Sequence, residues 1–320
     1  VAAAVAGCLP PDAAWRVRGL SYKDASLVAR LATRGFPHAD VWQPTALGVT
    51  DPCAGIETLQ QALITAAPEL ARQAGPADLI VARHILEHAH ALNDFFAALG
   101  ALLKPQGYLL LEVPDVSVAL ATLDYSTVWE EHRSYFTPDL LRLALAWHGY
   151  EILFFKTYPY PLENALVVLA RRAAAPRPVL PAAYLPAAQA TASRYRDQFA
   201  PRRELTRERV RHCRADGQVA IFGAGHLACK FINFNGLDEW IDFVIDDHPH
   251  KRGLCMPGSQ RPIVGSAALD DPALRLCLTS LNPESESRVR EKFSGFTERG
   301  GRFASIFPAS PQAFLPAARP

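Results

Sequence analysis

Short apolar runs alternate with amphipathic segments along the first half of the chain. The apolar runs predict buried strands at Trp15–Leu20, Asp78–Ala82 and Tyr108–Val113. Apolar positions at helical spacing predict four helices, at Ala25–Arg34, Thr58–Ala67 (interrupted or ended by Pro68), Ala91–Leu103 and Pro138–Trp147. This alternation is typical of a parallel sheet that is covered by helices on both faces.

The pattern changes after residue 150. Glu151–Tyr158 and Ala165–Ala170 flank a proline-rich turn and predict an antiparallel pair of strands at the sheet edge. Proline, alanine and arginine then dominate Arg171–Ala190, which predicts a linker. The polar stretch Ser193–Arg214 predicts an exposed connecting helix, and we expect its many arginines to form a solvated face.

A second α/β pattern follows on a smaller scale. Its predicted strands are Gln218–Phe222, Ile241–Ile245, Leu274–Thr279 and Arg302–Ile306. Helices are predicted after the first of these strands and around Ser285–Phe293. We therefore expect two α/β domains, residues 1–170 and 215–320, joined by a linker and connecting helix at 171–214.

Composition narrows the classes of partner and compartment. The 320 residues carry a net charge of +1, which gives no reason to expect nucleic acid or an anionic membrane as a partner. No apolar run approaches the ~18 residues of a membrane span, and Val1–Gly7 lacks the basic start of a signal peptide. Six scattered cysteines without a C-x-x-C pair predict a cytoplasmic protein without a zinc knuckle. Because the only methionine is Met256, we expect the natural chain to begin upstream.

A glycine-rich turn opens the second pattern. Gly223–Ala228 matches G-x-G-x-x-A between a strand and a helix, and Asp246 and Asp247 end the next strand about twenty residues later. This spacing places helix amides against a phosphate and a carboxylate near a ribose. It predicts a phosphate or nucleotide site, although a tight turn that merely needs glycine is the alternative.

The segment His84–His88 reads H-x-x-E-H, the inverted zinc-protease pattern. A helix would place His84 and His88 on one face. The segment lies at a predicted strand-to-helix junction, however, and no downstream carboxylate can be singled out as a third ligand. The pattern favours the lining of a cleft, and we predict no metal.

The polar and aromatic segment Trp129–Phe136 carries the candidate base. Glu130 and Glu131 precede His132 some way beyond the strand that ends at Val113. Sites in open α/β sheets form at the carboxyl ends of strands, and histidine is well suited to take a proton near neutral pH. By itself the segment also fits a solvated helix start with a chance histidine.

Several segments together resemble class I S-adenosylmethionine (SAM)-dependent methyltransferases. They are Ala77–His88, Leu102–Gly107 and Leu111–Asp115. Glu131–Phe136 narrows the resemblance to the sugar C-methyltransferase-like family. The end of the chain is similar to that family's closing domain, through Gly223–Gly225, Val244–Gly253, Pro257–Gly258 and Gly300–Phe303.

The resemblance implies a fold and a reaction. The fold is a Rossmann-like class I methyltransferase domain followed by a second, smaller Rossmann-like α/β domain; the family's N-terminal zinc module is absent from this sequence. In the family reaction, a base removes the proton from a carbon next to a keto group, and the enolate attacks the methyl group of SAM. The implied cofactor is therefore SAM, and the implied substrate is a small molecule, a nucleotide-linked keto sugar or a related metabolite.

The same resemblance assigns roles to residues by motif position. His132 is implied as the base, with Glu131 orienting its ring and stabilising its cation. The predicted cofactor residues follow the ends of successive strands and are Gly19, Ser21, Asp24, Gln43, Arg83 and His84. The predicted substrate residues are Gly223, Gly225, His226, Asp246 and Tyr135.

Three positions depart from the family pattern. The loop Gly19–Ser26 after the first strand has one glycine, Gln43 stands where an acidic residue is expected, and Trp129 stands where a tyrosine is frequent. Two alternatives therefore stay beside an active methyltransferase: a non-catalytic nucleotide-sugar-binding protein of the same fold, and an NAD-linked oxidoreductase that uses the Gly223 loop. Retention of His132 favours the active enzyme, and the oxidoreductase lacks an identifiable hydride-transfer site.

Overall fold

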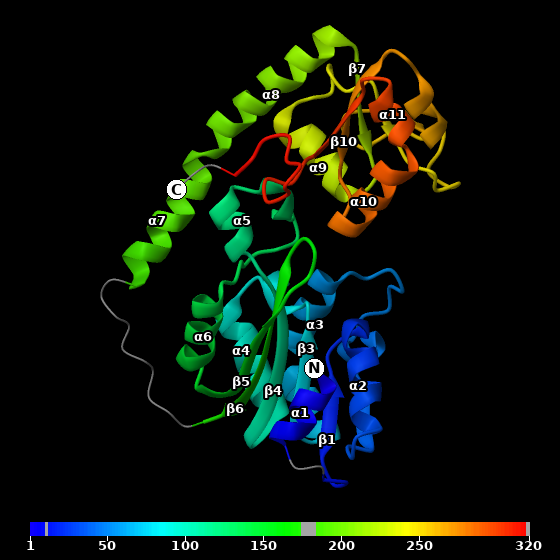
Figure 1. The fold of residues 1–320 in the computed structure, drawn as a ribbon. Coiled ribbons are helices and arrows are strands. Elements are labelled where there is room, and N and C mark those ends of the chain that lie inside the picture. The colour runs from blue at the N-terminus through cyan, green and yellow to red at the C-terminus, as the bar shows by residue number, and fades with distance from the viewer. Residues whose placement is uncertain (10–11, 174–183, 318–320) are drawn as a thin grey trace. The chain divides into compact units, whose positions relative to one another are not determined.

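The chain folds into two compact units (Figure 1). The computed structural model describes residues 1–9, 12–173 and 184–317. The first unit comprises the described parts of Val1–Ser117 and Trp129–Leu180, and the second unit comprises those of Val118–Val128 and Pro181–Pro320. The central part of the predicted linker, residues 174–183, lies outside the described residues.

A six-stranded sheet forms the centre of the first unit. Its strand order is β2-β1-β3-β4-β6-β5, with parallel pairing from β2 to β4 and antiparallel pairing of β6 with both β4 and β5. The predicted antiparallel strands at the sheet edge are thus confirmed. The strands are β1 (Arg16–Gly19), β2 (His38–Val41), β3 (Ala77–Arg83), β4 (Leu103–Asp115), β5 (Tyr150–Tyr158) and β6 (Asn164–Arg172).

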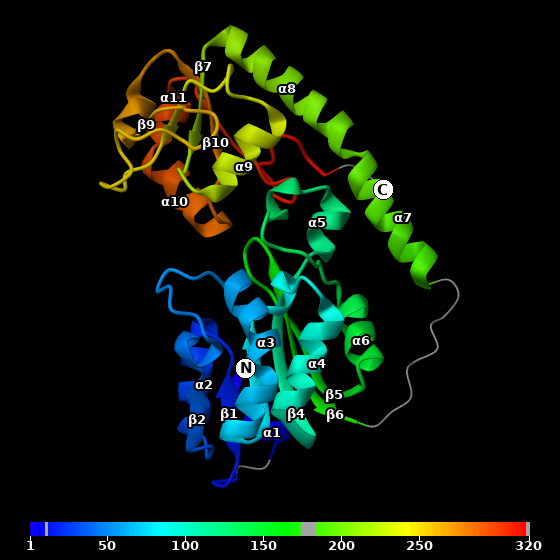
Figure 2. The same ribbon diagram turned by 180° about the vertical axis from the view of Figure 1, so that it is seen from behind.

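Helices cover both faces of this sheet, as Figures 1 and 2 show. One apolar cluster joins Ile80 and Leu111 to helices α3 (Ile56–Ala74), α4 (Leu92–Leu102) and α6 (Pro138–Trp147). A second cluster joins Leu79 and Leu110 to helices α1 (Ala2–Cys8) and α2 (Ala25–Ala32). Successive strand residues point to opposite faces, so these apolar runs are buried on both sides.

Pro68 does not end its helix, contrary to one expectation. Helix α3 continues through Pro68 to Ala74, and the proline itself is exposed. Leu63, Ala67 and Leu70 are buried on the inward side of the same helix. Burial of this apolar stripe outweighs the loss of one backbone hydrogen bond at the proline.

The second unit contains a five-stranded parallel sheet in the order β11-β10-β7-β8-β9. The strands are β7 (Gln218–Phe222), β8 (Phe243–Ile245), β9 (Ile263–Val264), β10 (Leu274–Thr279) and β11 (Arg302–Ser305). The helices with eight or more residues are α7 (Tyr184–Asp197), α8 (Phe199–Asp216), α9 (His226–Asn235) and α10 (Pro283–Lys292). The predicted Rossmann-like α/β architecture is therefore present in both units. Within the described residues, no helix has the length and apolarity that a membrane crossing requires.

Residues 118–128 cross into the second unit, which the predicted boundary at residue 170 does not anticipate. The Tyr125 hydroxyl donates to the Tyr195 carbonyl at 2.7 Å, and the Tyr195 hydroxyl donates to the Asp124 carbonyl at 2.6 Å. The two tyrosine rings lie 4.5 Å apart. These contacts join a segment between β4 and α6 to helix α7.

The predicted connecting helix is two helices of the second unit, and its arginines are not all solvated. Arg202 is buried and donates to the carbonyls of Leu315 and Pro316. Arg209 donates to the Phe314 carbonyl at 2.9 Å. The expectation of a solvated face is wrong at the buried Arg202, because the returning C-terminal segment offers carbonyl acceptors that local polarity cannot predict, whereas Arg209 is exposed as expected.

Candidate functional site

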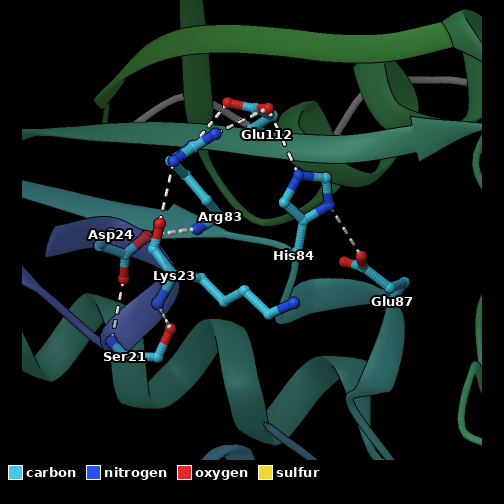
Figure 3. A network of polar contacts seen from close by, with 7 residues as sticks. All are labelled: Ser21, Lys23, Asp24, Arg83, His84, Glu87 and Glu112. Carbon is cyan, nitrogen blue, oxygen red and sulfur yellow. Dashed lines mark hydrogen bonds and ion pairs between the residues drawn. The ribbon is translucent and has the colours of Figure 1, made fainter. Parts of the chain in front are cut away.

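Polar side chains collect where β1, β3 and β4 end at one edge of the first sheet (Figure 3). These three strands are neighbours and parallel, so their carboxyl ends meet. Arg83 ends β3 directly opposite Glu112 of β4. The carboxyl edge is the side on which open α/β sheets bind ligands.

Asp24 holds the loop after β1 in place. Its carboxylate accepts hydrogen bonds from the backbone amides of Leu20 (2.8 Å), Ser21 (2.9 Å) and Arg83 (2.8 Å). The side chain is completely buried, and this burial raises the pKa of Asp24 to about 6 although the hydrogen bonds act in the opposite direction. Asp24 therefore ties the β1 loop to the end of β3 rather than presenting a carboxylate to a ligand.

Ser21 and Gly19 help to define the shape of the same loop. The Ser21 hydroxyl accepts from the Lys23 amide at 3.2 Å and forms a capping box with Asp24. A Cβ atom on Gly19 would lie 2.8 Å from the Asp24 Cβ and 3.0 Å from a Val41 methyl group. The protein's own side chains therefore require glycine at this position.

Hydrogen bonds to two other segments of the chain hold the Arg83 side chain in place. Its Nε and Nη2 atoms pair with both oxygens of Glu112, at 2.6 and 3.1 Å, and Nη1 donates to the Lys23 carbonyl at 2.9 Å. Burial opposes the charge of Glu112, but His84 and Arg83 outweigh it and lower the pKa of Glu112 to about 2. The fork-to-carboxylate geometry makes Glu112 a permanent anion at this edge.

His84 lies between two carboxylates. Its Nδ1 is 3.5 Å from Glu87 Oε1, and its Nε2 is 3.3 Å from Glu112 Oε1. Burial by itself disfavours the charged ring, but the hydrogen bonds and charges of Glu112 and Glu87 outweigh burial and raise the pKa of His84 to about 9. His84 is therefore a cation at neutral pH, and its φ of 51° is the left-handed conformation that non-glycine residues rarely adopt.

Gln43 follows β2 and is exposed. Its amide Nε2 donates to the Val41 carbonyl at 3.4 Å. The side chain amide is thus placed at the carboxyl end of the strand next to β1, where the sequence predicts a hydrogen-bonding partner for a ribose.

His132 lies in a second cluster beside the first. Its ring is 4.8 Å from that of His88, edge to face. The backbone amides of Arg133 and Ser134 both donate to the Glu87 carbonyl, at 2.8 and 3.0 Å. These bonds fasten the loop that carries His132 to the loop after β3, so the predicted base lies at the same carboxyl edge as His84.

Glu131 is exposed, and one of its carboxylate oxygens lies within 4.8 Å of ligand atoms of Glu57 and His88. Tyr135, predicted to contact substrate, uses its hydroxyl within its own loop instead. That hydroxyl accepts from the Trp129 amide at 3.0 Å and donates to the Trp129 carbonyl at 3.1 Å. Tyr135 therefore closes the loop that carries His132.

The H-x-x-E-H segment does not form the helix that a zinc-protease pattern needs. β3 ends at Arg83, and only Leu86–His88 form a short 3-10 turn. His84 faces Glu112, whereas His88 lies against His132. The two histidines are separated because the left-handed backbone at His84 turns the chain between them.

The glycine turn of the second unit is held by its own aspartate. Asp246 accepts from the Ala224 amide at 3.0 Å and the His248 amide at 2.9 Å, and pairs with Lys251 at 3.0 Å. Gly223 has a φ of 101°, and a Cβ there would lie 2.8 Å from a serine hydroxyl. A Cβ on Gly225 would meet nothing within 4 Å, and His226 after it is exposed. Open space therefore lies at Gly225, at the start of α9, while Asp246 supports the turn.

The sequence-based assignment of site residues did not include Glu112, and it gave Glu87 and His88 only as part of a segment that lines a cleft. Glu112 interrupts the apolar run Tyr108–Val113, and an acidic residue within such a run is a signal of a buried ion pair. Glu87 and His88 are buried just after β3. Their place in the site depends on contact with His132, which belongs to a segment far away in the sequence.

Two protein-family models and one curated relative match this chain. A family model described as a methyltransferase domain matches residues 32–153, and a model described as a C-methyltransferase C-terminal domain matches residues 187–308. The C-methyltransferase NovU of Streptomyces niveus is 29% identical over 320 residues, which is 91% of this chain and 74% of NovU.

Solved structures show a more distant likeness. The magnesium protoporphyrin IX methyltransferase of Synechocystis PCC 6803 has a TM-score of 0.37 and 17% identity, over 54% of this chain and 80% of that chain. The 1,6-didemethyltoxoflavin-N1-methyltransferase of Burkholderia thailandensis has a TM-score of 0.36 and 17% identity, over 54% of this chain and 76% of that chain.

Proposed function

We propose that the chain is a C-methyltransferase with a methyltransferase domain followed by a dedicated C-terminal domain, and that it methylates a carbon next to the carbonyl group of a nucleotide-linked keto sugar. The methyltransferase domain makes the chain an enzyme of the SAM-dependent class, as the sequence predicts. The observation that carries the proposal is the place of His132, which is held against the loop after β3 at the carboxyl edge of the first sheet.

The residues at this edge fit SAM. When bound, SAM supplies an electrophilic methyl group. Arg83 and His84 are cations that suit its carboxylate, and the exposed amide of Gln43 suits its ribose hydroxyls. We assign binding to these three side chains, while Gly19, Ser21 and Asp24 shape the loop beside them.

His132 acts as the base in this proposal. It would take the proton from the carbon next to the substrate carbonyl, and the electron pair of that C–H bond would pass into an enolate. With SAM bound, the enolate carbon would form the new C–C bond to the methyl group as the methyl–sulfur bond breaks and S-adenosylhomocysteine leaves. Glu131 supports the imidazolium that results. The bonds from Arg133 and Ser134 to Glu87 preorganise the base, since they hold its loop before any ligand arrives.

The second unit supplies the nucleotide site in this proposal. Helix α9 begins at Gly225 without a side-chain cap, and the space above Gly225 is open. Uncapped amides at a helix start attract phosphate. Asp246 acts through the turn by holding the Ala224 amide, and the exposed His226 borders the same opening.

Proton exchange tests the base directly. Wild-type enzyme should exchange the acidic carbon-bound proton of nucleotide-linked keto sugars in D₂O, followed by proton NMR, and should methylate the same carbon when SAM is present. His132→Asn should lower both rates by ~10²–10⁴-fold, because the side chain loses its basic nitrogen. Glu131→Gln should lower them less.

Calorimetric titration with SAM provides the control, because His132→Asn should leave SAM affinity nearly unchanged. Full turnover in His132→Asn would refute the role of this residue. If keto-sugar nucleotides bind to wild-type protein without exchange or methylation, the non-catalytic alternative replaces the proposal.

A further inference from the structure

Two buried polar atoms near His132 have no hydrogen-bond partner among the residues that the structure describes. They are Oε2 of Glu87 and Nδ1 of His88, in residues that are 2% and 7% exposed. Native proteins leave few buried polar atoms unpaired, and each exception calls for an explanation such as an ion. The two orphaned atoms belong to consecutive residues of one loop, and each of these residues has a ligand atom within 4.8 Å of one on the other.

His132 completes a donor set with these residues. One ligand atom from each of Glu87, His88 and His132 lies within 4.8 Å of the other two. Ligand atoms around a tetrahedral zinc ion lie roughly 3.3 Å apart, given metal–ligand distances of about 2.0–2.1 Å. Small side-chain rotations therefore suffice to close the three residues around an ion.

We propose that Glu87, His88 and His132 bind one divalent transition-metal ion of the zinc class. Two imidazoles and one carboxylate are a donor set that zinc accepts in sites with an open fourth position. Magnesium and calcium prefer oxygen ligands and do not suit two imidazoles. The backbone bonds from Arg133 and Ser134 to Glu87 keep the donors together without the ion.

The proposed site departs from the sequence-based prediction of no metal, and it differs from the H-x-x-E-H pattern. That pattern would pair His84 with His88, but His84 faces Glu112. The third donor, His132, comes from a segment far away in the sequence. A local spacing rule cannot find such a site because only folding brings the loop of His132 to Glu87.

Binding of the ion has a consequence for catalysis, which rests on the proposed function. An imidazole nitrogen that donates its lone pair to a metal cannot accept a proton. Zinc should therefore inhibit methylation reversibly, and a chelator should restore it.

Cobalt(II) alone is the probe, because its absorption reports ligand type. After treatment with a chelator, the full chain should bind Co²⁺ and give visible bands of a four- or five-coordinate site without a thiolate charge-transfer band. Zn²⁺ should displace it. Glu87→Gln and His88→Gln should weaken binding by more than the ~10–100-fold that is typical for losing a ligand's hydrogen-bond partner. His90→Gln, an exposed neighbour on the same loop, should bind as wild type does.

His132→Asn provides a variant at a half-buried loop position, in case the buried substitutions fail to fold. It should also weaken Co²⁺ binding. The proposal would be overturned if Co²⁺ binding were not saturable, if the spectrum showed a thiolate band, or if folded His132→Asn bound Co²⁺ as wild type does. So would loss of binding in Glu57→Gln but not in Glu87→Gln, because Glu57 and Glu131 form a second group around His88. None of these binding results depends on the methylation assay, so the metal site and the base role can fail separately.

Discussion

Asp24→Asn tests the claim that one buried carboxylate assembles the cofactor loop. The wild-type carboxylate accepts three backbone amides, two on Oδ2 and one on Oδ1. In mildly acidic solution the wild-type side chain is a carboxylic acid, and both of its oxygens can still accept a hydrogen bond. An asparagine side chain has one oxygen and one NH₂ group, so it can keep the amides of Leu20 and Ser21 but turns a donor toward the Arg83 amide. A buried donor without an acceptor costs ~1–3 kcal/mol. We expect the first unit to lose about that much stability in mildly acidic solution.

The stability difference between wild type and Asp24→Asn should change with pH in a defined direction. Burial raises the pKa of Asp24 from its ordinary 3.8 to about 6, so the folded protein holds this proton more tightly than the unfolded chain does. Stability from this residue is therefore fully present below pH ~4 and falls as the pH rises toward ~6. The total change is about 3 kcal/mol, since each pKa unit is worth ~1.36 kcal/mol. Asp24→Asn cannot ionise, so the stability gap between wild type and variant should narrow by up to that amount.

Urea unfolding at a series of pH values between 4 and 7.5 measures this gap. Tryptophan fluorescence follows the first unit, because four of the five tryptophans lie in it and only Trp240 lies in the second. Asp51→Asn is the control: this exposed aspartate accepts the Cys53 amide through one oxygen, which asparagine keeps. It should change stability by less than ~0.5 kcal/mol. A gap between wild type and Asp24→Asn that stays constant or widens as the pH rises would refute the reasoning.

Three further predictions concern the second unit and the His132 loop. Gly223→Ala should destabilise the second unit by ~1–3 kcal/mol in urea unfolding, because Gly223 has a positive φ and a hydroxyl lies close to the added Cβ. Gly225→Ala should change stability by less than ~0.5 kcal/mol but raise the KM for the nucleotide sugar. Equal stability losses in the two variants would contradict this prediction. Tyr135→Phe should remove both hydrogen bonds that close its loop and lower kcat with SAM affinity unchanged, and an unaltered kcat would disprove the loop's role. Arg202→Met should cost the second unit ~1–3 kcal/mol, because it removes the hydrogen bonds that the buried guanidinium donates to the Leu315 and Pro316 carbonyls, while Arg203→Met, at an exposed position, should not, as paired denaturation curves would reveal.

Local pattern determined most of the elements of this protein. Strands β7 (Gln218–Phe222) and β10 (Leu274–Thr279) and helix α6 (Pro138–Trp147) have the bounds that the sequence predicts. Each is a run whose apolar period matches a single kind of element, and α6 carries its own start signal, since the Thr137 hydroxyl accepts from the Leu140 amide. Such signals involve only a few neighbouring residues, so they can be recognised before the fold is known.

The family motifs can also be recognised from the sequence, because each is a short run of neighbouring residues. They identify the methyltransferase class and place His132 near the site. They do not say what a residue's side chain touches. Only the structure shows that Gly19 lies against Asp24 and that Asp24 accepts the Arg83 amide at the end of β3.

Tertiary structure alone decided the electrostatics of the site and the division of the chain. His84 is a cation because Glu87 and Glu112 approach it from two different elements. The donors Glu87, His88 and His132 meet because two loops are joined by backbone hydrogen bonds. The crossing of residues 118–128 into the second unit depends likewise on contacts with a distant helix. In each case the deciding energy comes from residues far apart in the chain, so no local pattern encodes it.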